Sequence, residues 1–162
     1  MGETSLSSGS RVLVIDDEPE MMDLIRLILD RERGDEVIRA VGGRKGITVA
    51  RDVLPDLIIL DIMMPDLDGW ETYTRIKAIP ALQQTPILFI AAASAEYIHP
   101  RAKQIGAMGY LQEPFGLSDL VTARDTVLSG ETYYPPVPEG MILGERRAGL
   151  LRWMINLFRR RR

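Results

Sequence analysis

The sequence predicts an α/β fold, in which a parallel sheet of five strands carries helices on both faces. Short apolar runs rich in β-branched residues recur from residue 11 to residue 111, and such runs are typical of strands buried on both faces. Longer segments with apolar residues at helical spacing lie between them,. This alternation favours parallel strands joined by crossover helices.

The first strand is expected at 11–16, and a helix follows it. Pro19 marks the first turn of that helix and Gly34 its end, because Pro is favoured at a helix start and Gly just past a helix end. Between them the apolar residues form one stripe at helical spacing, made of Met21, Leu24, Ile25, Ile28 and Leu29,.

The remaining elements continue the alternation. Further strands are expected at about 36–41, 57–61, 87–91 and 108–111, and further helices at about 44–54, around Trp70 to Lys77, and from 116 or 117 to 128. The fourth helix is less regular, because Pro100 lacks a backbone N–H and its ring crowds the preceding turn. We therefore expect this helix to begin near His99 and Pro100, after a long loop at 92–98, and Gly130 to end the domain.

Four parts are expected along the chain of 162 residues. A Ser/Gly-rich, disordered N-terminus covers 1–10, and the α/β domain covers 11–130. An extended Pro-rich linker covers 131–143, and a basic amphipathic helix covers 144–162.

Composition excludes several classes of protein. The chain has no cysteine and one histidine, His99, which excludes disulfides, thiolate chemistry and histidine-cluster metal sites. We see no apolar run long enough to span a membrane and no signal-peptide pattern, and therefore expect a cytoplasmic protein.

The net charge of −3 conceals an asymmetry. Residues 139–162 carry seven arginines against Glu139 and Glu145, a net charge of +5, whereas the rest of the chain carries −8. An acidic body with a basic tail indicates two separate tasks.

Acidic residues follow two of the predicted strands. Asp16 and Asp17 end the first apolar run, and Asp61 ends the third. In a doubly wound sheet, ligands gather at the carboxyl ends of the strands. Three carboxylates that meet there repel one another unless a cation neutralises them. Mg²⁺ prefers carboxylate oxygens and keeps several waters, so the sequence predicts a magnesium site.

Three segments resemble the receiver domains of two-component response regulators. They are the run VLVIDDEP at 12–19, the run DIMMPDLDG at 61–69 and the run GAMGYLQEPF at 106–115. The resemblance covers about residues 11–130. It implies a flavodoxin-like fold with strand order 2-1-3-4-5 and a cis bond between Glu113 and Pro114.

The resemblance also implies the site chemistry. Asp61 would accept a phosphoryl group from a histidine kinase or phosphotransfer protein. Asp17 and Asp61 would bind Mg²⁺ directly, Asp16 through water, and the backbone carbonyl of Met63 would complete the protein ligands. Tyr110 would be the switch aromatic residue. The surface at about 98–128 would carry the output to an unidentified downstream protein.

Two positions depart from the family pattern. Ala91 stands where the family usually has Thr or Ser, and it offers no hydroxyl to a phosphoryl oxygen. Glu113 stands where the family usually has Lys, so an anion replaces a cation beside the phosphate. A unit charge at ~4 Å is worth about 4 kcal/mol at an effective dielectric near 20.

Two functions therefore remain open. In the first, the chain is a stand-alone receiver that is phosphorylated on Asp61 and signals through protein contacts. In the second, it is a pseudo-receiver that serves as a docking module without phosphorylation. A hydrolase with a related fold would need an acid or base two residues after the nucleophile, and Met63 cannot serve, so we do not expect an enzyme.

The basic tail leaves three alternatives open. Its apolar stripe consists of Leu150, Trp153, Met154, Leu157 and Phe158. The helix could pack on its own domain, dock to a second copy or another protein, or lie on an anionic membrane. Too few residues follow Gly130 for a helix-turn-helix domain, so no sequence-specific DNA binding is expected.

Overall fold

The computed structural model describes residues 9–135. Most of the predicted linker and the whole predicted basic helix at 144–162 lie outside the described residues. Of the predicted disordered N-terminus, Ser10 is described, and its backbone N–H donates to Asp35 Oδ1 at 2.8 Å. This hydrogen bond ties the first described residues to the domain.

The sheet has five parallel strands in the order β2-β1-β3-β4-β5, as the resemblance implied. The strands are β1 (Arg11–Asp16), β2 (Glu36–Val41), β3 (Leu57–Asp61), β4 (Ile87–Ala91) and β5 (Gly109–Gln112). The helices are α1 (Pro19–Arg33), α2 (Gly43–Val53), α3 (Gly69–Lys77), α4 (Ala95–Gln104) and α5 (Leu117–Leu128), with a 3₁₀ turn at Pro80–Leu82.

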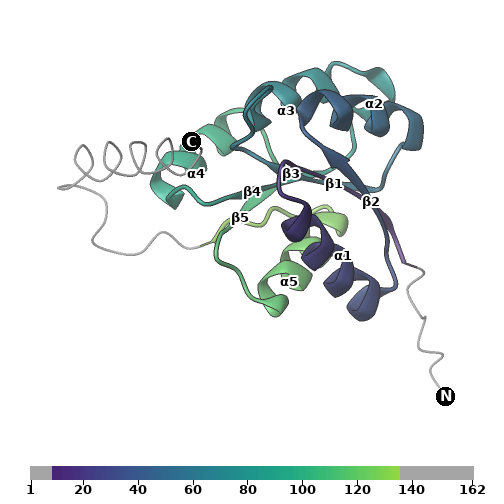
Figure 1. Ribbon diagram of the computed structural model, residues 1–162. Helices are drawn as coiled ribbons and strands as arrows, with labels where there is room; N and C mark the ends of the chain where they lie inside the picture. Colours follow the sequence, from purple (N-terminus) through teal and green to yellow (C-terminus); the bar gives the residue numbers. More distant parts are fainter. Residues whose placement is uncertain (1–8, 136–162) are drawn as a thin grey trace.

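The helices cover both faces of the sheet (Figure 1). Helices α1 and α5 pack on one face, and α2, α3 and α4 pack on the other. Two apolar cores result, because alternate residues of each strand point to opposite faces. Every residue of β3 and β4 is buried, which explains why their sequences are continuous apolar runs rather than alternating ones.

Local signals end the first helix where the sequence predicted. Gly34 follows α1 in the left-handed conformation, with φ of 68°, and its N–H donates to the carbonyl of Asp30 at 2.8 Å. A residue without a Cβ adopts this conformation at no steric cost. The chain thereby turns directly into β2.

The expected start of the fourth helix was wrong. Helix α4 begins at Ala95, and Pro100 lies inside it. Ser94 precedes the helix, and its carbonyl accepts from the N–H groups of Tyr97 and Ile98. The apolar residues Ala95, Ile98 and Ala102 are buried against the core. Pro100 removes one backbone hydrogen bond of the helix, and its ring crowds the preceding turn. The burial of these apolar side chains offsets both costs.

A buried ion pair joins the face of α1 and α5 to the sheet. Arg124 of α5 donates to both carboxylate oxygens of Asp35, at 2.9 and 2.5 Å. The two side chains are 8% and 0% exposed. Asp125 next to it pairs with Arg33 at the end of α1, at 2.7 Å. This network lies beside the start of β2, because Asp35 directly precedes that strand.

Candidate functional site

Three carboxylates meet at the carboxyl end of the sheet. Asp16 is the last residue of β1, Asp17 follows it, and Asp61 is the last residue of β3. Each offers a carboxylate oxygen, and these atoms all lie within 4.8 Å of one another. The two strands are neighbours in register, with Ile15 opposite Leu60. The fold therefore brings together the three residues that the sequence singled out.

Local hydrogen bonds orient two of these side chains. The backbone N–H of Glu18 donates to Asp16 Oδ1 at 2.9 Å. The backbone N–H of Met63 donates to Asp61 Oδ1 at 3.1 Å. The backbone of Met63 thus lies beside Asp61, while the role of its carbonyl as a metal ligand stays a prediction.

The loop after β3 folds back over the strand end. The N–H of Gly69 donates to the carbonyl of Ile62 at 2.8 Å. A Cβ at Gly69 would lie 2.4 Å from the carbonyl oxygen of Asp61 and 2.5 Å from Ile62 Cα. Only glycine allows this approach, and it sets the loop of residues 62–68 close to the carboxylates.

The loop ends at Asp68, which caps α3 by accepting a hydrogen bond from the N–H of Glu71 at 2.8 Å.

Burial and mutual repulsion dominate the electrostatics of the cluster. Burial, followed by the negative charge of Asp16, raises the pKa of Asp61 to about 9. Burial also raises the pKa of Asp16 to about 7, and the charges of Asp17 and Glu18 add to this effect. Charged carboxylates in this place need a cation beside them.

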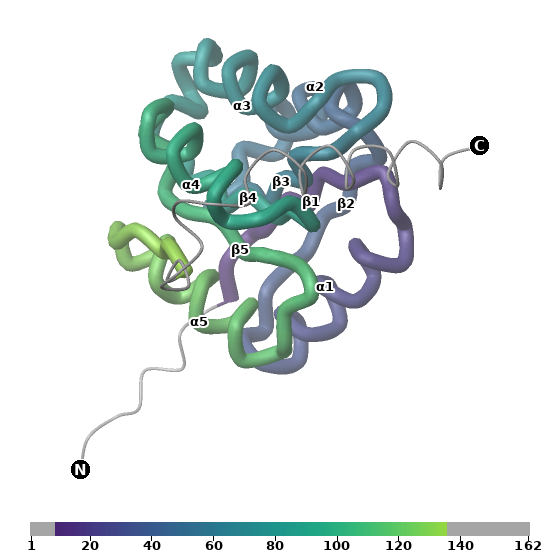
Figure 2. The backbone as a smooth tube through the Cα atoms, turned by 90° about the vertical axis from the view of Figure 1, so that its left-hand side faces the viewer, coloured from purple at the N-terminus to yellow at the C-terminus, as the bar shows by residue number. Residues whose placement is uncertain are grey.

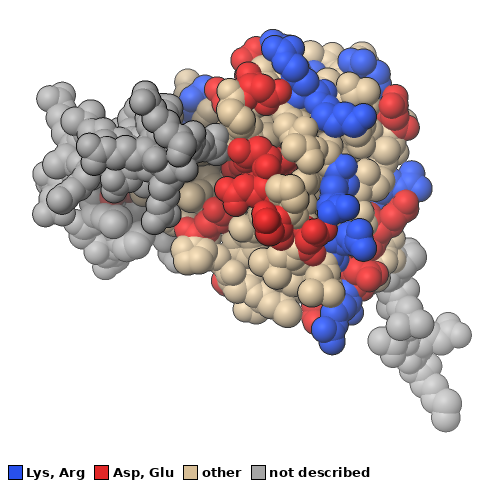
Figure 3. All heavy atoms as spheres, in the orientation of Figure 1, with Lys and Arg blue, Asp and Glu red and all other residues tan. Residues whose placement is uncertain are grey.

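The donor set fits Mg²⁺. Three carboxylate oxygens within reach of one ion are hard ligands, and Mg²⁺ binds through one or two carboxylates and keeps waters in its remaining positions. A space-filling view shows acidic side chains gathered over the start of α1 on this face (Figure 3). The sequence analysis predicted a magnesium ion here, and the arrangement of the three carboxylates suits that ion.

Glu113 lies close enough to the cluster for the charges of Asp17 and Glu18 to act on its carboxyl. Its N–H donates to the carbonyl of Ala91 at 2.8 Å, which fixes its backbone at the end of β5. Burial raises the pKa of the Glu113 carboxyl, and the negative charges of Glu18 and Asp17 raise it further. Two residues beyond the predicted triad, Glu18 and Glu113, therefore add negative charge here. The resemblance had already marked Glu113 as a departure from the family pattern, whereas Glu18 was interpreted only as a residue before a helix.

Ala91 and Tyr110 occupy the interior next to the site. Ala91 ends β4 and is fully buried. Tyr110 is 0% exposed, and within the described part of the chain its hydroxyl has no hydrogen-bond partner. The ring contacts His99 of α4 and Tyr134, with ring centroids at 6.0 and 5.9 Å. Because residue 91 is alanine, it has no hydroxyl that could form a hydrogen bond with Tyr110.

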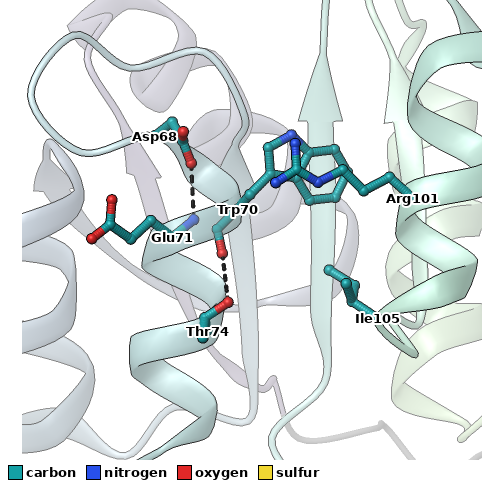
Figure 4. Close-up of a pocket in the computed structure, with 6 residues that line it drawn as sticks. All are labelled: Asp68, Trp70, Glu71, Thr74, Arg101 and Ile105. Carbon is teal, nitrogen blue, oxygen red and sulfur yellow. Dashed lines mark hydrogen bonds between the residues drawn. The ribbon is translucent and has the colours of Figure 1, made fainter.

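A separate pocket lies between α3 and α4 (Figure 4). The guanidinium of Arg101 stacks over the ring of Trp70, 4.6 Å from its centroid. Asp68, Glu71, Thr74 and Ile105 line the rest of it. None of the three clustered carboxylates lines this pocket. No sequence signal pointed to it.

Among residues 9–135, no helix is long and apolar enough to cross a membrane. Away from the site, exposed ion pairs such as that between Arg11 and Glu36 lie on the surface, and the buried pair of Arg124 and Asp35 is internally satisfied. The carboxylate cluster is therefore the strongest candidate for a functional site in the part of the chain that the structure describes.

Comparison with known proteins points to one family. The model of one protein family, described as Response regulator receiver domain, matches residues 12–125. A relative named Putative transcriptional regulator, from Pseudomonas aeruginosa, is 36% identical over 126 residues, which cover 78% of this chain and 60% of the relative. Protein PilG from the same species is 32% identical over 117 residues, which cover 72% of this chain and 86% of PilG.

Solved structures show the same fold. The chemotaxis response regulator CheY4 of Vibrio cholerae matches with a TM-score of 0.69 and 28% identity, covering 74% of this chain and 99% of that one. A putative response regulator from Chloroflexus aurantiacus matches with a TM-score of 0.69 and 28% identity, covering 75% and 99%. The chain spans less than two thirds of the first curated relatives that it matches.

Proposed function

The chain belongs to the response regulator receiver domain family of two-component systems, and from this we propose that it relays a signal by accepting a phosphoryl group on Asp61 with the help of Mg²⁺. The donor would be a histidine kinase or a phosphotransfer protein, and the output a contact with another protein. The observation that carries the proposal is the meeting of Asp16, Asp17 and Asp61 within 4.8 Å.

The proposed step transfers a phosphoryl group between two protein side chains. A carboxylate oxygen of Asp61 forms the new bond to phosphorus, while the bond from phosphorus to the donor's histidine nitrogen breaks. The electron pair of that bond stays on the nitrogen, and the product is an acyl phosphate on Asp61. Bound Mg²⁺ would neutralise the phosphoryl oxygens as charge moves.

The residues of the chain divide the work. Asp17 and Asp61 would hold the ion directly, and Asp16 through a water molecule, with the Met63 carbonyl completing the protein ligands. The N–H of Met63 donates to Asp61 Oδ1 at 3.1 Å and so orients the carboxylate that would attack. The proposal is therefore a signalling module that would carry a phosphoryl group, rather than an enzyme that turns over a free substrate.

Two observations favour a second candidate function, a docking module that works without phosphorylation. Ala91 is fully buried and supplies no hydroxyl to a phosphoryl oxygen. Glu113 places an additional negative charge near Asp17 and Glu18. Both changes oppose the binding of a phosphoryl group, whereas neither disturbs the fold.

Mass spectrometry of the intact chain separates the two functions. With acetyl phosphate and Mg²⁺, we expect the protein to gain the mass of one phosphoryl group. Asp61→Asn should show no gain, and Asp66→Asn, which removes an exposed carboxylate from the same loop, should behave like the wild type. If no gain occurs with any small phosphodonor, the docking module is the better account.

The remaining proposals follow from the sequence. We propose that the protein works in the cytoplasm as a stand-alone receiver. Contact with a membrane or with a second copy through residues 144–162 stays a prediction, as does the lack of sequence-specific DNA binding.

A further inference from the structure

The pocket between α3 and α4 is lined by side chains that a protein segment can contact. Its volume is about 260 Å³, slightly below the range typical of sites for drug-sized ligands. Asp68 and Glu71 lie on its α3 side, and Arg101 and Ile105 lie on its α4 side (Figure 4). All of its lining residues except Trp70 are exposed. A pocket of this size and exposure suits the side chains of a docked segment.

Exposed apolar surface continues from the pocket along α4. Tyr97, Arg101 and Ile105 follow one another at a spacing of four residues, which places neighbours of this series on the same face of a helix. Tyr97 is 41% exposed and Ile105 is 36% exposed. Exposed apolar side chains that gather beside a pocket are typical of a surface that contacts another segment.

The charges at the pocket call for an occupant with both signs. The guanidinium of Arg101 lies over Trp70, and within residues 9–135 no carboxylate forms an ion pair with it. On the α3 side, Glu71 pairs with Arg75, whereas Asp68 has no cationic partner in the same part of the chain. An occupant that carries arginines together with a glutamate therefore matches the pocket better than a purely anionic or cationic one.

The end of the described chain is anchored beside α4. The sequence analysis expected residues 131–143 to form a free linker, but Tyr133 forms a parallel β-bridge with Gly109 at the edge of the sheet. The ring centroid of Tyr134 lies 4.9 Å from that of His99 and 5.3 Å from Lys103 Nζ, and both of these residues belong to α4. Figure 2 shows this part of the chain beside β5. Whatever follows Pro135 therefore starts next to α4.

The chain beyond this anchor is long enough to reach the pocket. Eight residues, 136–143, precede the segment at 144–162 that the sequence predicts to be a basic amphipathic helix. An extended Pro-rich chain covers about 3.1 Å per residue, so these residues span about 25 Å. A helix with its side chains is about 10–12 Å across, so the segment can pass over α4. A short tether also gives an effective concentration in the millimolar range, at which weak contacts suffice.

We propose that residues 144–162 dock along α4 and fill the pocket between α3 and α4 of their own domain. The apolar stripe of the segment meets Tyr97 and Ile105, and its arginines face Asp68 and Glu71. The last 24 residues carry a net charge of +5 and the rest of the chain −8, so attraction also acts over longer distances. Of the three alternatives that the tail sequence left open, these observations favour packing on the same domain.

Paramagnetic relaxation in the full chain tests the docking. The chain has no cysteine, so Asn156→Cys with a nitroxide attached gives a single label outside the apolar stripe. The amide signals of Thr74 and Arg101 should lose at least half of their intensity relative to the sample with reduced nitroxide. The amides of α1, which lies on the opposite face of the sheet, should keep theirs.

Charged substitutions on α4 show whether this surface holds the segment. In the labelled chain, Ile105→Asp should restore the signals of Thr74 and Arg101, because a carboxylate opposes the apolar contact. Tyr97→Asp, at the other end of the same face, should also restore them. Leu117→Asp is the matched control, because Leu117 is a 49% exposed residue of α5, and it should leave the loss unchanged. Unchanged β3 amide signals show that each variant keeps its fold.

A mixed sample separates the same chain from a second copy. When isotope-labelled chain without nitroxide is mixed with unlabelled chain that carries it, the signals should stay at full intensity. Loss of intensity there would show a second copy in the pocket and overturn the proposal. The proposal is also overturned if Thr74 and Arg101 keep full intensity in the labelled chain, as a segment that binds only a membrane predicts, or if the loss survives both Ile105→Asp and Tyr97→Asp. The samples contain no phosphodonor, so the result is independent of the proposed phosphorylation of Asp61.

Discussion

Reversing the charge at position 113 should weaken the binding of Mg²⁺ and speed the phosphorylation of Asp61. Glu113 is half-buried, and the pKa of its carboxyl is raised first by burial and then by Glu18 and Asp17. Replacement by Gln removes one negative charge, and replacement by Lys adds a positive one. The series Glu113, Glu113→Gln and Glu113→Lys should therefore weaken Mg²⁺ binding step by step, and speed phosphorylation at saturating Mg²⁺ step by step.

The size of each step follows from Coulomb's law. One unit charge at ~6 Å from another is worth about 3 kcal/mol at an effective dielectric near 20. Position 113 is partly open to solvent, and screening reduces this to about 1–2 kcal/mol. Each step should then change the Mg²⁺ dissociation constant and the phosphorylation rate by about 5- to 30-fold, in the opposite sense for the two quantities.

The assay uses acetyl phosphate and intact mass to follow phosphorylation, with Mg²⁺ affinity measured by calorimetry. Glu32→Lys makes the same change in net charge at an exposed position of α1, and it should alter neither quantity by more than about twofold. If all three residues at position 113 give the same Mg²⁺ affinity and the same rate, Glu113 does not act on the site and the reasoning is wrong.

Three further predictions concern stability and the switch. Arg124→Ala should lower the free energy of unfolding by about 3–5 kcal/mol in urea titrations, because it leaves Asp35 buried without its cation,; Arg11→Ala, at an exposed pair, should cost under ~1 kcal/mol,. Without Mg²⁺, stability should fall as pH rises from about 4 to about 9. The raised pKa of Asp61, about 9, means that the folded protein keeps a proton that the unfolded chain has lost,. Asp61→Asn should flatten this slope in thermal unfolding, and an unchanged slope would contradict the assignment. Ala91→Thr should cost roughly 1–2 kcal/mol of resting stability, since it buries a hydroxyl, yet it should lengthen the lifetime of the acyl phosphate; an unaltered lifetime would show that position 91 does not reach the phosphoryl group.

Most of the sheet was predictable because its strands are buried on both faces. Strands such as β3 and β4 read as continuous apolar runs, and their bounds at 57–61 and 87–91 match the prediction. The strand order came from the resemblance, since periodicity alone does not fix which strands are neighbours. The cis bond between Glu113 and Pro114, which the resemblance also implied, is present.

The errors have physical causes. Because Pro is disfavoured inside a helix, the start of α4 was predicted after Ile98. In the structure the helix includes Ile98, and the burial of its side chain outweighs the cost of Pro100. The bridge between Tyr133 and Gly109 of β5 was missed because Tyr133 and Tyr134 stand before Pro135 and Pro136, in a segment whose composition resembles a linker. Their pairing with β5 depends on contacts across more than twenty residues of sequence, which no local pattern encodes.

The sequence was enough to predict which three carboxylates lie together, but not which further acidic residues lie near them. Strand ends placed Asp16, Asp17 and Asp61 together, as observed. The sequence identified Glu113 as a departure from the family, yet its proximity to Glu18 and Asp17 needed the folded chain. The roles of these residues in binding and phosphoryl transfer stay predictions.

Titration of the full chain with Mg²⁺, followed by backbone NMR, tests the central claim most directly. We expect saturable shifts at millimolar Mg²⁺, centred on the amides of residues 16–18 and 61–63. They should be lost in Asp17→Asn and retained in Asp66→Asn. Spectra that do not change at millimolar Mg²⁺, or shifts that survive in Asp17→Asn, would contradict a magnesium site built from these three carboxylates.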